Sequence, residues 1–264
     1  MNPEADIIIS VKDLSVSYGE RLIFKNVNFE VRRGEVFVIL GGSGSGKSTL
    51  LKTMIGLYPP QRGEVWIEGG NVVSPNENQR LEILRRFGVM YQSGALFGSM
   101  TVLENVQLPL DEFTALPKPI KELVVLAKLK LVGLAGAARK TPSELSGGMQ
   151  KRAAIARAMA LDPRILFLDE PSSGLDPITS AGLDELITGL ARHFGITFVI
   201  VTHELPSVFA IADRVIMLDS RVRTISAEGK PGELRERATD PWVRQFFNRQ
   251  PDPALSFHLD KSHA

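Results

Sequence analysis

Short runs of apolar residues separated by polar turns occupy the first quarter of the chain. Runs of this length, in part β-branched, are typical of buried strands. They predict strands at residues 7–11, 27–31, 36–40 and 65–67. Gly34 and Gly63 lie in turns between these runs. We therefore expect a β-rich N-terminal region.

The middle of the chain has the spacing of helices instead. Thr101 and Glu104 have the spacing of a capping box, in which each side chain bonds the backbone N–H of the other residue at a helix start. Pro119 then precedes a run of leucines at helical spacing. We interpret residues 93–161 as a helical subdomain inserted into the fold.

Strands and helices alternate in the next segment. Strands are predicted at residues 165–168, 198–201 and 215–218, with helices that begin at Pro177 and Leu205. This alternation is typical of a parallel sheet covered by helices, so the predicted fold class is α/β. We expect residues 1–229 to form one domain.

A C-terminal extension is predicted for residues 230–264. Pro231 and Pro241 divide it into two short helical stretches. Its last residues, 251–264, mix proline, charged and apolar side chains. We expect this tail to be mobile or to be ordered by a partner.

Composition narrows the function classes. The chain has 264 residues and is 44% apolar, which is enough for a substantial core. Its 31 basic and 30 acidic residues leave a net charge of +1, so there is no bulk electrostatic reason to expect nucleic acid as a partner. The absence of cysteine excludes disulfides, thiolate metal sites and cysteine nucleophiles.

Neither a secretory signal nor a membrane-spanning helix is predicted. The N-terminus carries Glu4 and Asp6 and lacks a basic stretch followed by a long apolar core. The most apolar region, residues 124–138, is interrupted by Lys128 and Lys130 and is shorter than the ~20 apolar residues of a spanning helix. If the protein works at a membrane, another subunit must do the spanning.

A glycine-rich segment between a predicted strand and a predicted helix carries the first chemical motif. It matches the phosphate-loop pattern with Gly41, Gly42, Ser43, Gly44, Ser45, Gly46, Lys47, Ser48 and Thr49. In this pattern backbone N–H groups surround the phosphates of ATP, the lysine reaches the terminal phosphates, and the Ser48 hydroxyl holds Mg²⁺. Glycine permits close backbone approach and positive φ, and the helix N-terminus favours the anion. A chance glycine-rich turn is the alternative.

Two carboxylates follow the strand predicted at residues 165–168. Neighbouring residues at a strand end point in different directions, so Asp169 can serve the metal while Glu170 orients the attacking water. A lone Asp-Glu pair is usually a helix cap, but the phosphate loop upstream favours the catalytic interpretation. His203 follows the strand at residues 198–201 and would reach the same sheet edge, where it can contact the terminal phosphate.

Residues 145–150 have the sequence Leu-Ser-Gly-Gly-Met-Gln, which phosphate-loop enzymes in general do not share. It resembles the signature motif of ATP-binding cassette proteins. By this resemblance Tyr18 stacks on adenine, Gln92 is the metal-binding glutamine between the two lobes, residues 173–176 form a dimer-contact loop, and His203 is the switch histidine. The resemblance implies a P-loop NTPase of this type, with a mostly parallel RecA-like core sheet, an N-terminal antiparallel β-subdomain and the helical subdomain.

Each of these residues taken alone has an ordinary structural explanation. Tyr18 alone would be a packing or surface tyrosine, Gln92 a solvated polar residue, and His203 a hydrogen-bonded histidine at a strand end. Their joint placement along the chain favours the ATPase.

The resemblance also implies a head-to-tail homodimer. In this dimer Ser146, Gly147 and Gly148 of one subunit close over ATP held by the phosphate loop of the other. The physical argument agrees, because a serine and two glycines before a helix predicted at residues 149–161 form a second anion-binding helix start. Two such sites in one chain need two ATP-facing surfaces, which a symmetric dimer supplies.

Residues 91–102 are the most informative segment for the subfamily. They resemble the ATPase of bacterial Mla/Mce-type lipid transport systems, as do residues 116–119, 142–145, 176–179 and 240–246. This resemblance implies phospholipid traffic between inner and outer membranes, powered from the cytoplasmic face of the inner membrane. The implied partners are an integral membrane permease, a small regulatory domain protein and a periplasmic Mce-domain protein. Ordinary variation among cassettes for other substrates is the alternative.

Two apolar clusters are candidate docking surfaces. By family analogy, a groove for a permease helix would be lined by Ala95, Leu96, Phe97 and Met100; core packing is the alternative. Trp242 and Phe246 share one helical face because they are four positions apart. They either pack on their own domain or help the tail to dock on a sister subunit or a regulator.

Two further function classes differ from transport. Cassette ATPases that act on ribosomes or DNA usually have two cassettes in one chain or a long coiled-coil insertion, and this sequence has neither. The second class binds nucleotide without hydrolysing it, and Glu170 and His203 argue against that class.

Overall fold

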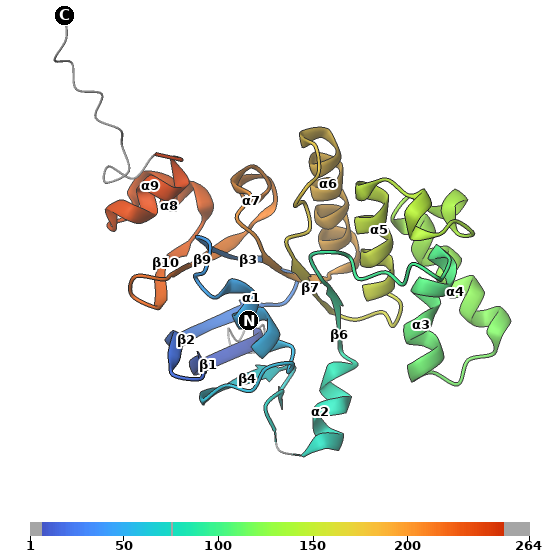
Figure 1. Ribbon diagram of the computed structural model, residues 1–264, viewed down its shortest axis with the longest axis horizontal. Coiled ribbons are helices and arrows are strands. Elements are labelled where there is room, and N and C mark those ends of the chain that lie inside the picture. The colour runs from blue at the N-terminus through green and yellow to red at the C-terminus, as the bar shows by residue number, and fades with distance from the viewer. Residues whose placement is uncertain (1–6, 75, 251–264) are drawn as a thin grey trace, which may run out of the picture.

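The computed structural model describes residues 7–74 and 76–250, which form two sheets and several helices (Figure 1). The first sheet is antiparallel, with the order β2-β1-β4-β5. Its strands are β1 (Ile7–Tyr18), β2 (Arg21–Arg32), β4 (Arg62–Ile67) and β5 (Gly70–Asn71). The predicted β-rich N-terminal region is confirmed. Strand β1 is longer than the apolar run because it continues past Val11 through a bulge, where Asp13 has a φ of 48°.

The second sheet has the order β10-β9-β3-β8-β7-β6 and is parallel except for the antiparallel edge strand β10. Its strands are β3 (Val36–Gly41), β6 (Phe87–Met90), β7 (Ile165–Asp169), β8 (Thr197–Val201), β9 (Arg214–Asp219) and β10 (Thr224–Gly229). The predicted parallel sheet is confirmed. Strand β6 was not predicted because Gly88 interrupts its apolar run. A Cβ at Gly88 would lie 2.0 Å from the carbonyl oxygen of Ala158, so close helix packing requires glycine there.

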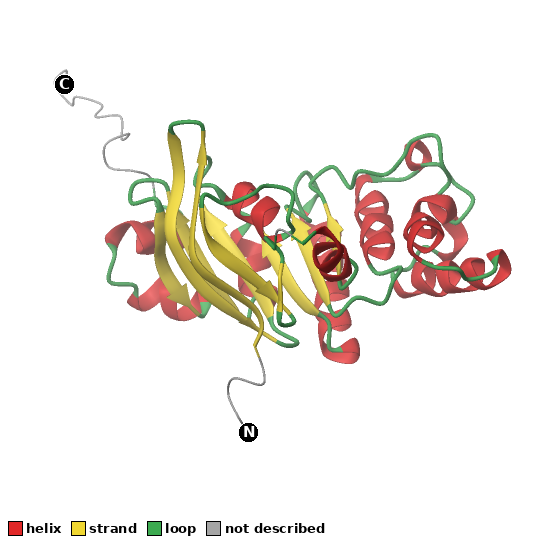
Figure 2. Cartoon of the chain, turned by 90° about the horizontal axis from the view of Figure 1, so that it is seen from below, coloured by secondary structure: helices red, strands yellow, loops and turns green. Residues whose placement is uncertain are grey.

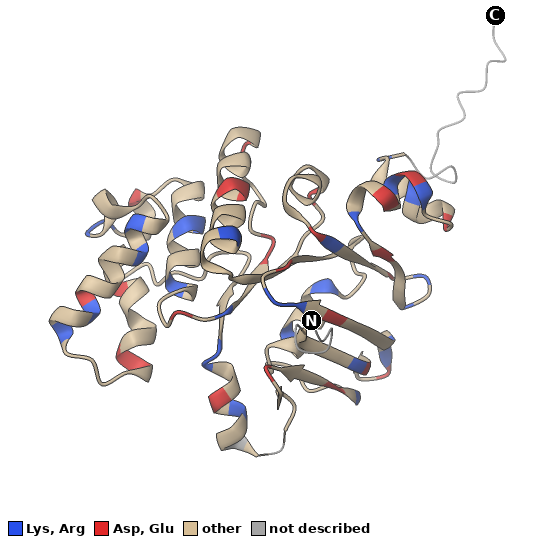
Figure 3. Cartoon of the chain, turned by 180° about the vertical axis from the view of Figure 1, so that it is seen from behind, with Lys and Arg blue, Asp and Glu red and all other residues tan. Residues whose placement is uncertain are grey.

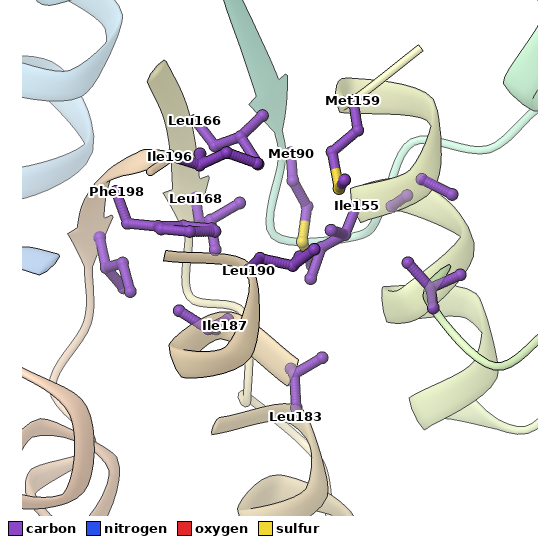
Figure 4. Close-up of a cluster of buried hydrophobic side chains, with 14 of the residues drawn as sticks. Met90, Ile155, Met159, Leu166, Leu168, Leu183, Ile187, Leu190, Ile196 and Phe198 are labelled. Atoms are coloured by element: carbon purple, nitrogen blue, oxygen red, sulfur yellow. The ribbon is translucent and has the colours of Figure 1, made fainter. Parts of the chain in front are cut away.

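Both faces of the second sheet are buried, which explains why its strands are continuous apolar runs. Alternate residues of β3 belong to two hydrophobic clusters, with Val38 in one and Phe37 in the other. The first cluster joins the sheet to helices α5 and α6, and side chains of β6, β7, β8 and both helices converge in Figure 4. The second cluster joins it to the first sheet and α1 (Lys47–Met54). In Figure 2 the strands of both sheets lie together, and a group of helices lies beside them at the right of the view.

The predicted helical subdomain contains α3, α4 and α5, which lie together at one end of the molecule in Figure 1. The capping box is confirmed, because Thr101 N donates to Glu104 Oε2 at 2.7 Å and Glu104 N to Thr101 Oγ1 at 3.2 Å. The α-helices beyond α1 are α2 (Glu77–Leu84), α3 (Val102–Phe113), α4 (Lys118–Leu131), α5 (Gly147–Ala158), α6 (Pro177–Phe194), α7 (Leu205–Ile211), α8 (Pro231–Arg237) and α9 (Pro241–Phe247). Helix α2 was not predicted because its sequence is mostly polar.

The two C-terminal helices pack on the body of the protein. Leu234, Val243 and Phe247 belong to the same buried cluster as the central sheet. Trp242 and Phe246 lie side by side with ring centroids 5.8 Å apart and pack against that cluster. Of the two alternatives for this pair, packing on its own domain is therefore the observed one. The tail of residues 251–264 lies outside the described residues.

Charged residues are spread over the surface rather than gathered in one region. Basic and acidic residues are interspersed in the view of Figure 3, so the near-zero net charge does not arise from two separated blocks there. Among the helices of the described residues, none has both the length and the apolar character to cross a membrane. Local side chains at a site, rather than a bulk field, must therefore select a charged ligand.

Candidate functional site

The glycine-rich segment connects the end of β3 to the start of α1, which confirms the predicted strand–loop–helix context. Gly44 and Gly46 have φ values of 74° and 96°, in the region that favours glycine. A Cβ at Gly41 would lie 2.4 Å from Ser45 Oγ. No side chain caps α1 at Gly46. The first N–H groups of the helix are therefore available for an anion.

Lys47 is folded back over this loop. Its Nζ donates to the carbonyl oxygens of Gly41 at 2.9 Å and Gly42 at 3.2 Å. Burial lowers the pKa of Lys47, and the carboxylates of Glu170 and Asp169 act in the opposite direction. The structure thus brings the predicted cation and both predicted carboxylates to one place.

Ser48 and Asp169 place two side-chain oxygen atoms close together, where they could hold a cation. Ser48 Oγ donates to Asp169 Oδ1 at 3.5 Å. Burial raises the pKa of Asp169 and the neighbouring Glu170 carboxylate raises it further, so a cation would stabilise the ionised form. Hard oxygen ligands supplemented by phosphate oxygens suit Mg²⁺. In the part of the chain that the structure describes, no three His, Cys, Asp or Glu side chains gather as a metal cluster.

Glu170 has different hydrogen-bond partners from Asp169. Its Oε1 lies 2.8 Å from Nδ1 of His203, and its Oε2 accepts a hydrogen bond from Thr202 Oγ1 at 3.0 Å. Glu170 is only 7% exposed, whereas His203 is half-exposed. The carboxylate is therefore held in one orientation from the end of β8.

Lys47, Glu170 and His203 border a cleft of about 630 Å³, a usual size for a small-molecule site, whereas Asp169 is not among its lining residues. We call it the phosphate cleft, and its lining residues are Gly41, Gly42, Ser43, Gly44, Lys47, Ser48, Glu170, His203, Leu205, Phe246 and Arg249. The sequence analysis anticipated all of these except the last three. Leu205 begins α7, and Phe246 and Arg249 come from the C-terminal end, so only the tertiary fold brings them to the phosphate loop.

Tyr18 and Gln92 lie outside the lining of the phosphate cleft. The Tyr18 hydroxyl is 3.3 Å from Thr49 Oγ1, and its ring meets that of Tyr58 edge-on at 4.8 Å between centroids. The ring is 43% exposed, which leaves area for a base to stack next to the phosphate loop. Gln92 is exposed, and its carbonyl oxygen accepts a hydrogen bond from Lys151 Nζ.

The signature residues are also outside the lining of the phosphate cleft. Ser146 caps α5 by accepting from Met149 N at 3.3 Å. The helix thus begins at Gly147 and ends at Ala158, which corrects the predicted range of 149–161, because glycine is tolerated in the first turn next to a good cap. A Cβ at Gly148 would lie 2.3 Å from Thr179 Cγ2, so this glycine is required for packing on α6.

Comparison with known proteins decides the family. A family model described as "ABC transporter" matches residues 24–173, a segment that contains the phosphate loop, the signature residues and Glu170. The chain belongs to the ABC transporter family. The sequence-based assignment is thereby confirmed, and with it the P-loop fold of this type and the ATPase class.

Curated relatives of this ABC ATPase cover almost all of it. It is 41% identical over 260 residues to the "Intermembrane phospholipid transport system ATP-binding protein MlaF" of Escherichia coli (strain K12), with 96% of each chain covered. It is also 41% identical over 242 residues to the "Probable ribonucleotide transport ATP-binding protein mkl" of Mycobacterium leprae (strain TN), covering 92% of this chain but 69% of that protein.

Solved structures of cassettes have the same fold as this ABC ATPase. The dimeric post-hydrolysis state of the ATP-binding cassette MJ0796, bound to ADP and Pi, superposes with a TM-score of 0.76 at 34% identity and covers 84% of this chain and 98% of that one. The cbiO1 protein from Clostridium perfringens superposes with a TM-score of 0.80 at 29% identity. The match covers 88% of this chain and 92% of that one.

The sequence analysis missed Thr202 and Lys151, whose side chains both form hydrogen bonds with Glu170 in this ABC ATPase. Thr202 could have been suspected, because it is a hydroxyl at the end of an apolar strand directly before His203. Lys151 had no distinguishing sequence feature, since a lysine in the first turns of a helix is usually solvated.

Proposed function

We propose that this chain is the ATP-hydrolysing subunit of a bacterial system that transports phospholipid between the inner and outer membranes. The observation that carries the proposal is the similarity to MlaF, which extends over 96% of both chains. The relative named for ribonucleotide transport is equally identical, but this chain covers only 69% of its length. Phospholipid is therefore the favoured substrate.

The proposed nucleotide is ATP with Mg²⁺. Residues 41–49 bind the phosphates, Tyr18 stacks on adenine, and Lys47 reaches the terminal phosphates. Ser48, Asp169 and Gln92 would hold Mg²⁺, which when bound neutralises charge on the phosphate oxygens.

Glu170 is the proposed general base. It accepts a proton from the water that attacks the terminal phosphate, and contributions of this type are typically worth about 10²- to 10⁴-fold in rate. Thr202 and His203 orient its two carboxylate oxygens at 3.0 and 2.8 Å. His203 is half-exposed toward the cleft and can also contact the terminal phosphate.

The proposed active form is a homodimer. None of the described residues that line the phosphate cleft comes from the signature segment at 145–148, so a single subunit provides only part of an ATP site. In the proposed dimer Ser146, Gly147 and Gly148 of a second copy cover the phosphates. The dimeric MJ0796 cassette supports this arrangement by its similar fold.

The proposed membrane partner is an integral permease that docks near Phe97. This ring is 50% exposed although its backbone is held firmly. The buried Asn105 accepts from Phe97 N at 2.7 Å and donates to the Phe97 and Met100 carbonyl oxygens at 3.1 and 3.2 Å. A rigid loop that presents an apolar ring suits a helix-in-groove contact. A small regulatory domain protein and a periplasmic Mce-domain protein complete the proposed system, with this chain peripheral on the cytoplasmic face.

Reconstitution with the co-purifying integral subunit in liposomes tests the proposal. ATP should drive transfer of a fluorescent phospholipid, whereas labelled ribonucleotides should not move. The variant Phe97→Asp should keep ATP hydrolysis and lose transfer, and Phe113→Asp, at another exposed phenylalanine, should keep both. Ribonucleotide movement would favour the other substrate, and normal transfer by Phe97→Asp would remove the proposed docking site.

A further inference from the structure

Lys151 is a buried cation on α5, three residues after the signature glycines. It is 8% exposed, and its Nζ donates to the carbonyl oxygens of Gln92 and, at 3.3 Å, of Glu170. Burial lowers the pKa of Lys151, while the Asp169 and Glu170 carboxylates act in the opposite direction. A hydrogen bond from an ammonium group to a carbonyl is stronger than a neutral one, so these two contacts are substantial.

The Glu170 backbone is held in an unusual conformation. Its φ is 47°, which is uncommon for any residue other than glycine. Such a conformation persists only where the surroundings fix it from several sides. Glu170 N donates to the Val201 carbonyl oxygen at 2.8 Å, and Lys151 binds the Glu170 carbonyl oxygen. The Glu170 carbonyl oxygen, which the neighbouring strand does not hold, is therefore held by Lys151 together with Ser173 N, which donates to it at 3.2 Å.

The loop that carries Gln92 is held by the same helix at two points. Arg157 donates to the carbonyl oxygens of Gly94 at 2.9 Å and Ala95 at 2.7 Å, and Lys151 binds that of Gln92. Only Lys151 also reaches Glu170. A single ammonium group thus connects the signature helix, the Gln92 loop and the residue proposed as general base.

We propose that Lys151 is a positioning residue for ATP hydrolysis, which fixes Glu170 relative to the Gln92 loop and makes both follow the signature helix. The inference rests on the proposed catalytic role of Glu170. Helix α5 carries the signature residues, which in the proposed dimer face the ATP of the second copy. A displacement of α5 would therefore also move Glu170 of the same subunit.

Arg152 provides a matched control on the same helix. Its guanidinium also donates to two carbonyl oxygens, those of Val132 at 3.2 Å and Gly182 at 2.9 Å. Neither acceptor lines the phosphate cleft. Loss of either Lys151 or Arg152 removes two comparable hydrogen bonds from α5. Of these two cations, only Lys151 reaches Glu170.

The test compares Lys151→Met, Lys151→Arg and Arg152→Met by kcat, by the Kd for ATP and by Tm. Lys151→Met should lower kcat by about 10- to 100-fold, the size of effect expected from a misplaced catalytic group, with the Kd for ATP within about twofold. Lys151→Arg should restore most of kcat. Arg152→Met should keep kcat within about threefold of the wild type at a similar loss of Tm.

The Glu170→Gln background separates this inference from its premise. Because Lys151 acts through Glu170, Lys151→Met should cause no further loss of the residual turnover of Glu170→Gln. A further tenfold loss there, an equal loss of kcat in Arg152→Met, or a normal kcat in Lys151→Met would overturn the inference. If Glu170→Gln itself hydrolyses ATP normally, the proposed role of Glu170 fails and the inference with it. If Lys151→Met does not fold, Lys151→Gln replaces it. Its shorter, uncharged amide cannot reach both carbonyl oxygens, so kcat should again fall, and a normal kcat would overturn the inference.

Discussion

The phosphate-loop half and the signature half of the nucleotide machinery are built differently. Lys47 begins α1 just after β3, and Asp169 and Glu170 lie at the end of β7 in the same parallel sheet. Each of the three is tied by hydrogen bonds to other residues of the same subunit. Ser146 and Gly147 lie exposed at the start of α5, outside the phosphate cleft. The residues of the phosphate-loop half thus contact one another within one chain, whereas Ser146 and Gly147 of the signature half face the solvent.

This difference follows from strand topology. The carboxyl ends of parallel strands meet at one sheet edge, so residues far apart in sequence assemble there without a partner. The signature residues begin a helix of the helical subdomain and pack against Thr179 on α6 instead. In the proposed dimer, the phosphate loop of one copy would therefore meet the signature residues of the other.

The largest effect is expected in the phosphate-loop half. Glu170→Gln should lower ATP turnover by about 10²- to 10⁴-fold, because an amide cannot accept the proton. ATP binding should be retained, since the phosphate loop is unchanged. Single-turnover hydrolysis and binding of a fluorescent ATP analogue measure the two quantities. Turnover near the wild-type rate would remove Glu170 from the chemistry.

The signature half can be tested by crosslinking, because the chain contains no cysteine of its own. In the Glu170→Gln background, Ser43→Cys combined with Ser146→Cys should form a disulfide-linked dimer that becomes the major species only when ATP is added. Non-reducing gels measure the yield. Each single cysteine variant is the control. A yield that does not depend on ATP would mean that the two halves do not meet across a dimer.

A smaller effect is expected when Glu170 loses the hydrogen bond that it accepts from Thr202. Thr202→Val removes the hydroxyl that donates to Glu170 Oε2 at 3.0 Å while keeping the side-chain shape. We expect kcat to fall about tenfold, which corresponds to ~1.4 kcal/mol. Thr202→Ser should retain activity because it keeps the donor. Equal kcat values for the valine and serine variants would show that this bond does not orient the base.

The smallest effect concerns stability without nucleotide. Because the pKa of Asp169 is raised in the folded protein, its ionised form opposes folding above that pKa, and the penalty disappears as the pH falls. Asp169→Asn should therefore raise Tm by about 2–4 °C at pH 8 and by less in acid, although it abolishes hydrolysis.

Asp219 is the control of opposite sign. Burial raises its pKa, but hydrogen bonds from Arg221 outweigh burial, and the net pKa of Asp219 is lowered. Its ionised form thus stabilises the fold above its unfolded pKa, and this stability is lost as the pH falls. Asp219→Asn should lower Tm at pH 8. Equal shifts for both variants in calorimetry would contradict the assigned pKa directions.

The spacing of residues in the sequence was sufficient to predict individual strands, helices and helix caps. The strand before Gly41, the helix after it and the capping box at Thr101 were predicted because burial periodicity and cap chemistry act over a few residues. Strand β6 and helix α2 were missed. In the first a glycine required by a distant helix interrupts the pattern, and in the second the sequence is mostly polar.

The sequence by itself determined that a phosphate-loop motif lies between a strand and a helix, and that Asp169, Glu170 and His203 come at the ends of buried strands. Only the tertiary structure decided which other groups meet them. Lys151 and Gln92 are 59 positions apart, and Thr202 and Glu170 are 32 apart. Contacts of this kind depend on strand order and helix packing, which a periodic pattern of buried positions does not encode.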